Sequence, residues 1–151
     1  MEVLQIPVPK NLYTVIIHPQ IEIKTSAARS ILPKNVPLSD AVIQWANVGS
    51  LVHALHTSDY GLIKRSLEDI IIEPYRAQLI PHYQDIKNQA LKAGALGASI
   101  SGSGPSVFML TEGLDIAKKV EQAIRSVYSK TTIAFETYVS SINVEGIKIL
   151  S

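Results

Sequence analysis

A glycine-rich stretch in the second half of the chain constrains the fold more than any other feature. Residues 101–106 read Ser-Gly-Ser-Gly-Pro-Ser, and the apolar run 107–110 that follows has the pattern of a buried strand. Gly102 and Gly104 lack a Cβ, so each can adopt the positive φ angles that other residues avoid. The pattern predicts two strands joined by a tight turn. On the pattern alone, an ordinary hairpin turn and a loop whose backbone N–H groups converge on an anion are both open.

Length and composition narrow the class of protein. The 151 residues predict one domain over residues 1–151, large enough to bury a core. With 14 basic and 13 acidic side chains and no basic cluster, the sequence argues against a nucleic-acid partner. The absence of cysteine excludes disulfides and thiolate metal sites. No apolar run is long enough to span a membrane and no signal-peptide pattern opens the sequence, so we expect a cytoplasmic protein without a membrane partner.

The balance of apolar and charged residues is unusual. The chain is 46% hydrophobic and only 18% charged, which is more apolar than a domain of this size needs. Part of its surface is therefore expected to meet a partner.

Hydrophobic periodicity predicts an α+β fold. The expected strands are 12–18, the two strands that flank the glycine turn, and two terminal strands at 132–139 and 142–150. The expected helices are 27–32, about 40–56, 60–71, 74–92 with an interruption at Pro81, and 115–128. The helix at 40–56 is apolar on most of its sides, which predicts that it is buried and that Trp45 belongs to the core or its rim. This order of elements favours a mostly antiparallel sheet with helices packed on one face.

Three segments of the chain resemble the GHMP kinases, named after galactokinase, homoserine kinase, mevalonate kinase and phosphomevalonate kinase. Residues 94–108, Gly-Ala-Leu-Gly-Ala-Ser-Ile-Ser-Gly-Ser-Gly-Pro-Ser-Val-Phe, resemble the third conserved motif, which lies in the second half of those enzymes. Residues 25–33 resemble the T-x-x-A-R-x-x-L-P segment of the homoserine kinases, and residues 69–81 resemble their D-x-x-x-E-P-x-R-x-x-x-I-P segment. In matching order and spacing, the resemblance covers most of the chain. It implies a ferredoxin-like C-terminal domain of a GHMP kinase.

The resemblance also implies an activity. The intact enzyme would transfer the γ-phosphoryl group of ATP to L-homoserine, a step in threonine biosynthesis. The implied ligand contacts are two arginines for the carboxylate of homoserine (Arg29 and Arg76) and a loop that supports the phosphates (Ser101, Gly102, Ser103 and Gly104). The arginine assignment is chemically sound, because a guanidinium presents a planar fork of donors that fits a carboxylate.

These polar residues also have ordinary interpretations. In one such interpretation, Arg76 would form a surface ion pair with Glu73 at i, i+3, and Arg29 would only stabilise the end of a helix. Each contact would then add roughly 0–1 kcal/mol to the free energy of unfolding. His53 and His56 lie three residues apart on an apolar helix without nearby carboxylates, which favours packing over metal binding.

Relatives in this family carry an N-terminal domain with a nucleotide loop of the P-x-x-x-G-L-G-S-S-A-A type, and nothing in the sequence resembles it. Phosphoryl transfer requires the phosphate cradle, the metal and the acceptor in one place. We therefore assign no catalytic residue and no metal ligand to this chain, and we expect it to be inactive alone. ATP and Mg²⁺ would belong to the intact enzyme, with no cofactor tightly bound here and the missing N-terminal domain as a partner.

Two other functions are open. In the first, the chain would be a domain of another GHMP small-molecule kinase. In the second, it would be a stand-alone regulatory module that binds an amino acid. The sequence also leaves open a homodimer and feedback by threonine.

Overall fold

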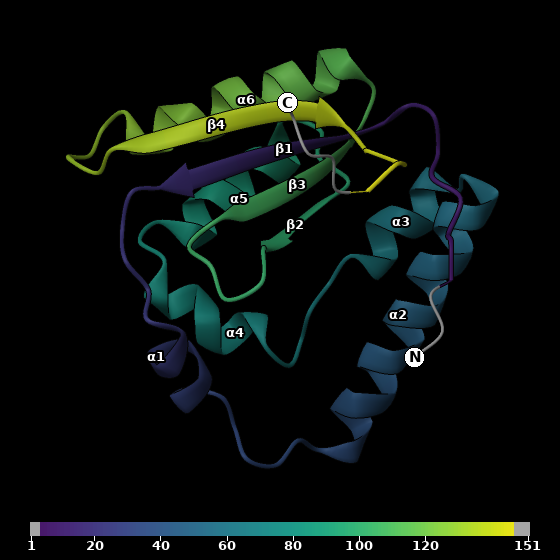
Figure 1. The fold of residues 1–151 in the computed structure, drawn as a ribbon, viewed down its shortest axis with the longest axis horizontal. Helices are drawn as coiled ribbons and strands as arrows, with labels where there is room; N and C mark the ends of the chain where they lie inside the picture. The colour runs from purple at the N-terminus through teal and green to yellow at the C-terminus, as the bar shows by residue number, and fades with distance from the viewer. Residues whose placement is uncertain (1–3, 147–151) are drawn as a thin grey trace.

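The computed structural model describes residues 4–146, which form a four-stranded antiparallel sheet with helices (Figure 1). The strands lie in the order β2-β3-β1-β4. Their bounds are Leu12–Pro19 for β1, Gly97–Ile100 for β2, Val107–Glu112 for β3 and Phe135–Ser141 for β4. The strands at 12–18 and on both sides of the glycine turn are thus confirmed.

One face of the sheet is covered by α5, Tyr83–Lys92, and α6, Leu114–Tyr128. Alternate residues of β1 explain this layer: Val15 and Ile17 are fully buried in the main core cluster, while Ile16 between them is only partly buried. The order β1-α5-β2-β3-α6-β4 is the ferredoxin-like arrangement. The α+β fold with helices packed on one face is therefore confirmed.

A helical insertion joins β1 to α5 and lies below and beside the sheet in Figure 1. Its helices are α1, Thr25–Ser30, α2, Leu38–Thr57, α3, Tyr60–Ser66, and α4, Glu73–Arg76, and a 3₁₀ turn at Ala77–Leu79 follows. Pro74 stands in the first turn of α4, where a proline needs no hydrogen-bond acceptor. The predicted interruption at Pro81 is confirmed, since α5 begins two residues later.

The prediction that the helix at 40–56 is buried is wrong. Of the residues of α2, only Ala54 is buried, and Trp45 is 64% exposed. Leu38, Val42, Trp45 and Val52 are all exposed, and their spacing of three, four and seven residues places them on one helical face. The error has a physical cause. An apolar sequence indicates that a helix is covered by other apolar side chains, but the described residues cover α2 on one side only.

Other element boundaries also differ from the prediction. The helix expected at 27–32 is α1, which begins and ends two residues earlier, at Thr25–Ser30. The helix expected at 60–71 ends at Ser66, and Asp69 instead accepts hydrogen bonds from the backbone N–H groups of Ile71 and Ile72 in a turn before α4. Of the two terminal strands, the first is β4, whereas residues 142–146 form no strand. The remainder of the second, 147–150, lies outside the described residues. Between residues 4 and 146, no helix is long and apolar enough to cross a membrane.

Candidate functional site

The glycine stretch forms the loop between β2 and β3, and it approaches α4 (Figure 1). Gly102 has φ +61° and Gly104 has φ +81°, angles that favour glycine. An added Cβ at Gly102 would meet nothing within 4 Å, whereas at Gly104 it would lie 3.1 Å from Ile80 Cδ1. The loop therefore has an open outer glycine and a tightly packed inner one.

Backbone hydrogen bonds hold the loop in this shape. The N–H of Ser101 donates to the carbonyl of Ser106 at 2.8 Å, and the N–H of Gly104 donates to the carbonyl of Ser101 at 3.0 Å. Within residues 4–146, the N–H groups of Gly102 and Ser103 have no acceptor. Two of the loop's donors are thus free for an anion at its outer side, and the donors of Ser101 and Gly104 are already used.

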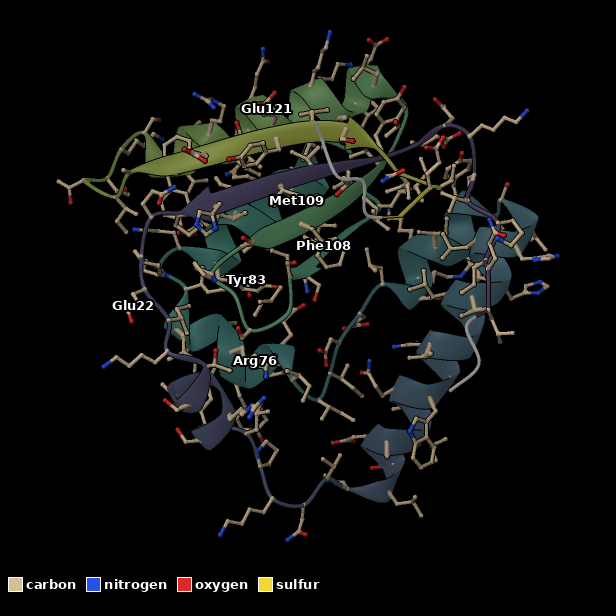
Figure 2. All side chains as sticks on the ribbon, viewed as in Figure 1. Glu22, Arg76, Tyr83, Phe108, Met109 and Glu121 are labelled. Atoms are coloured by element: carbon tan, nitrogen blue, oxygen red, sulfur yellow. The ribbon has the colours of Figure 1, made fainter. Side chains whose placement is uncertain are left out.

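Arg76, the last residue of α4, connects the loop to the first helix. Its Nη1 donates to the carbonyl of Gly102 at 2.7 Å, and its Nε donates to the carbonyl of Ala28 in α1 at 3.3 Å. Figure 2 labels Arg76 at this junction between α4 and α1. The structure thereby brings together the three segments that were singled out in the sequence.

Arg29 follows Ala28 directly in α1, so the two arginines lie on adjoining helices. Arg29 is exposed, and its guanidinium has no hydrogen bond or ion pair with any residue of the described chain. Its complete fork of donors is available to a ligand. By contrast, Arg76 has two of its five N–H donors engaged and keeps three.

The alternative pairing of Arg76 with Glu73 does not form. Glu73 is buried, and its carboxylate instead makes an ion pair with Lys87 of α5 and accepts a hydrogen bond from Ser99 Oγ of β2 at 3.1 Å. Tyr83 lies between α4 and the sheet in Figure 2. Burial first, and the carboxylate of Glu73 second, raise the pKa of Tyr83 well above its usual value of 10.0. The four residues, called the Glu73 cluster below, form a polar group beneath the loop.

Sequence reasoning missed one further polar contact at the loop. His18 Nδ1 lies 2.8 Å from Ser106 Oγ, which joins the end of β1 to the last residue of the loop. The signal that finds it is strand register: Ile17 pairs with Val107, so the next residue of β1 lies beside the residue before Val107. That register cannot be read from one sequence without knowing which strands are neighbours.

No group of three or more potential metal ligands from histidine, aspartate and glutamate exists within residues 4–146. His53 and His56 are exposed on α2, so their expected packing role is at most partial. The candidate site within residues 4–146 is thus defined by donors for an anion, at Arg29, Arg76 and the N–H groups of Gly102 and Ser103.

Comparisons with known proteins identify the family of the chain. Residues 51–130 match the family described as GHMP kinases C terminal. A homoserine kinase of Chlorobium phaeobacteroides is 45% identical over 152 residues, covering 99% of this chain and 48% of the relative. The crystal structure of homoserine kinase from Cytophaga hutchinsonii superposes with a TM-score of 0.92 at 51% identity, over 94% of this chain and 45% of that chain.

A more distant structure shows how widely the fold is shared. Streptococcus pneumoniae phosphomevalonate kinase, solved in complex with phosphomevalonate and AMPPNP, has a TM-score of 0.73 at 15% identity, over 93% of this chain and 43% of that one. At that identity the likeness concerns the fold alone. The chain spans about half the length of the relatives that it matches.

Proposed function

Because the chain belongs to the family of GHMP kinase C-terminal domains, we propose that it is the C-terminal half of a homoserine kinase. The intact enzyme would transfer the γ-phosphoryl group of ATP to the hydroxyl of L-homoserine and form O-phospho-L-homoserine in threonine biosynthesis. A cytoplasmic location accompanies this role. Similarity to homoserine kinases along nearly the whole chain supports this assignment over other GHMP kinases.

The chain's part in substrate binding is to hold the carboxylate of homoserine between two arginines. Arg29 offers its whole fork of donors, so it suits a two-pronged contact with the carboxylate. Arg76 contributes from the adjoining helix with the donors that Gly102 and Ala28 leave free. Two guanidinium groups on neighbouring helices favour an anionic ligand, which agrees with an amino-acid substrate.

The loop of Ser101, Gly102, Ser103 and Gly104 supports the phosphates of ATP in this proposal. Two observations fit: the N–H groups of Gly102 and Ser103 have no acceptor within residues 4–146, and the outer side of Gly102 is open to close approach. Mg²⁺ would lower the cost of the negative charge during phosphoryl transfer. We assign its protein ligands to the N-terminal half, because no group of three or more histidine, aspartate and glutamate side chains lies within residues 4–146.

The N-terminal half is the partner that the exposed face of α2 fits best. The relatives contain a further half that this chain does not match. Val8 packs in the same cluster as Leu51 and Leu55 of α2, so the segment that carries Val8 covers the other side of this helix and leaves the exposed face open. We therefore assign the apolar stripe of Leu38, Val42, Trp45 and Val52 to the interface between the halves.

One observation carries the proposal: Arg76 joins α1 and the glycine loop in a chain that is 51% identical to a homoserine kinase structure. The test is a fusion of this chain to the N-terminal half of the Cytophaga hutchinsonii enzyme. The fusion is given ATP, Mg²⁺ and either L-homoserine, mevalonate or phosphomevalonate, and products are identified by ³¹P NMR. We expect O-phosphohomoserine only. A phosphorylated mevalonate product, with homoserine unchanged, would assign the chain to another GHMP kinase.

A further inference from the structure

We propose that Glu73 is a positioning residue, which fixes Arg76 and the glycine loop relative to each other through its buried contacts with Lys87 and Ser99. The inference deepens the proposed function, and its catalytic consequence rests on that function. The geometry behind it stands independently. Glu73 lies one helical turn before Arg76 in α4. Contacts that hold the carboxylate of Glu73 in place therefore also fix the backbone position from which the Arg76 side chain extends.

Helix α4 has little stability of its own. It comprises four residues, Glu73–Arg76, and isolated helices far longer than this are marginal in water. Its N-cap, Ile72, makes no side-chain cap. The turn at Asp69 orders the approach to the helix, and the contacts of Glu73 attach the helix to the sheet.

Glu73 connects α4 to two other elements, α5 and β2. Lys87 belongs to α5, in the layer behind the sheet, and Ser99 belongs to β2, two residues before the loop begins. One carboxylate therefore ties α4 both to α5 and to β2, the strand that leads into the loop. From the other end of the same short helix, Arg76 reaches the loop at Gly102. Glu73 thus attaches α4 to the strand that precedes the loop, and Arg76 attaches it to the loop itself.

Burial of the ion pair between Glu73 and Lys87 adds little to the stability of the fold. The side chains of Glu73 and Lys87 are only 11% and 18% exposed, and burying an ion pair contributes less to stability than a well-packed apolar pair often does. A buried carboxylate with fixed partners is better explained by the position that it imposes than by the stability that it adds. Glu73 accepts from partners on two elements, so its carboxylate restrains α4 relative to both α5 and β2.

The consequence is that the charge at position 73 controls the loop and the substrate arginine together. Glu73→Gln keeps the shape of the side chain and removes the ion pair with Lys87. Ser99→Ala keeps the ion pair and removes only the link to β2, so it provides a variant whose folding is little affected. Exposed Glu68 supplies the matched control, Glu68→Gln, which removes one carboxylate five residues earlier.

The test is amide hydrogen exchange of the 151-residue chain, followed by NMR. The reporters are the amides of Ser101 and Gly104, which are bonded within the loop, and the reference amides are those of Val15 and Ile17 in the central strand. Arg76→Ala should accelerate exchange of the reporters by roughly tenfold, because a charge-assisted hydrogen bond to the loop is lost. Glu73→Gln and Ser99→Ala should accelerate the same amides relative to the references, and Glu68→Gln should not.

Two results overturn the inference. The first is reporter exchange within twofold of the wild type in both Glu73→Gln and Ser99→Ala. The second is equal acceleration of reporters and references, which assigns Glu73 to global stability alone. Kinetics of the fusion then test the catalytic consequence: Glu73→Gln should raise the KM of homoserine and of ATP together, as Arg76→Ala does. A fusion that is inactive even with the wild-type chain contradicts the proposed function and leaves the exchange result intact.

Discussion

Arg76 and Arg29 are chemically alike but differ in how much of each guanidinium is already engaged. Arg76 donates to carbonyl oxygens of Gly102 and Ala28, which stand 26 and 48 residues away in the sequence. Arg29 is exposed and makes no such contact with the described chain. Under the proposed function, Arg29 serves the substrate alone, whereas Arg76 serves the substrate and the loop.

This difference predicts unequal effects of the two alanine substitutions in the fusion enzyme. Arg29→Ala should raise the KM of homoserine by roughly ten- to a hundredfold, because charge-assisted hydrogen bonds worth about 1.5–3 kcal/mol are lost, and should leave the KM of ATP unchanged. Arg76→Ala should raise both. Arg29→Lys should recover little, since an ammonium cannot reproduce the two-pronged contact. Steady-state kinetics with each substrate varied measures these effects.

The matched control is Arg65→Ala, an exposed arginine on α3 that should change neither KM. A homoserine KM within threefold of the wild type in both Arg29→Ala and Arg76→Ala would remove the arginines from the substrate site.

The two loop glycines predict a second contrast. Gly102→Ala places a side chain in open space at φ +61°, so the unfolding free energy should fall by only about 1–2 kcal/mol, while the KM of ATP rises. Gly104→Ala adds a contact of 3.1 Å with Ile80 to a positive φ and should lose clearly more stability. Chemical denaturation of the chain and ATP kinetics of the fusion separate the two effects.

Gly146→Ala is the control for this series, because Gly146 also has a positive φ of +72° and open space around its Cβ direction. It should share the modest stability loss of Gly102→Ala without the ATP effect. If Gly102→Ala behaves like Gly146→Ala in both measurements, the loop is only a turn.

At the scale of elements, α2 carries more exposed large apolar residues than any other helix of the described chain. One side packs through Ala54, Leu51 and Leu55 against α3 and the segment that carries Val8. The stripe on the other side includes Trp45, which is 64% exposed. Exposed apolar residues that share one helical face mark an interaction surface.

A lysine in the middle of this stripe should therefore weaken the association of the two halves without unfolding the chain. Trp45→Lys removes an apolar contact worth about 1.5–3 kcal/mol when buried, which corresponds to roughly a ten- to hundredfold higher Kd for the separately produced N-terminal half. Isothermal titration calorimetry measures the Kd, and circular dichroism should show an unchanged melting temperature.

Leu91→Lys, at a 40% exposed position on α5, provides the control and should leave the Kd unchanged. If Trp45→Lys dissociates a dimer of this chain and binds the N-terminal half as the wild type does, the stripe is an interface between two copies instead.

The elements also show what one sequence can predict. The β-branched and aromatic run at 12–18 and the apolar run after the glycine turn predicted their strands, because the core that covers them lies within the chain. The same reasoning failed for α2, whose cover is not among the described residues. At the site, motifs located the arginines and the loop. The Glu73 cluster and the contact of His18 with Ser106 required the tertiary fold, since their members are separated by up to 88 residues.

At the scale of the whole molecule, Tyr128 links α6 to the segment just before α5, so it connects the two helices that cover the sheet. This residue is fully buried at the end of α6, and its hydroxyl donates to the carbonyl of Pro81, just before α5, at 2.6 Å. Burial raises the pKa of Tyr128 to about 12. Because ionisation is disfavoured in the folded state, the stability that this residue contributes is complete below pH 10 and is lost as the pH rises from 10 to 12.

Tyr128→Phe should therefore be less stable than the wild type by about 1 kcal/mol at pH 7, where the hydrogen bond to Pro81 is lost. The phenylalanine cannot ionise, so this difference in unfolding free energy should shrink as the pH passes 10 and approaches 12. Guanidinium unfolding at pH 7, 10 and 11 measures it. A difference that stays constant over this range would contradict the assigned pKa.

Under the proposed function, this chain completes a homoserine kinase and is expected to have no kinase activity by itself. The direct measurement is homoserine-dependent formation of ADP as the chain is titrated into the separately produced N-terminal half of the Cytophaga hutchinsonii enzyme, with ATP and Mg²⁺ present. The account predicts no turnover by either half alone, and activity that rises with added chain and saturates near equal concentrations. Turnover by the purified chain alone, or an inert mixture in which calorimetry shows that the halves have bound each other, would contradict it.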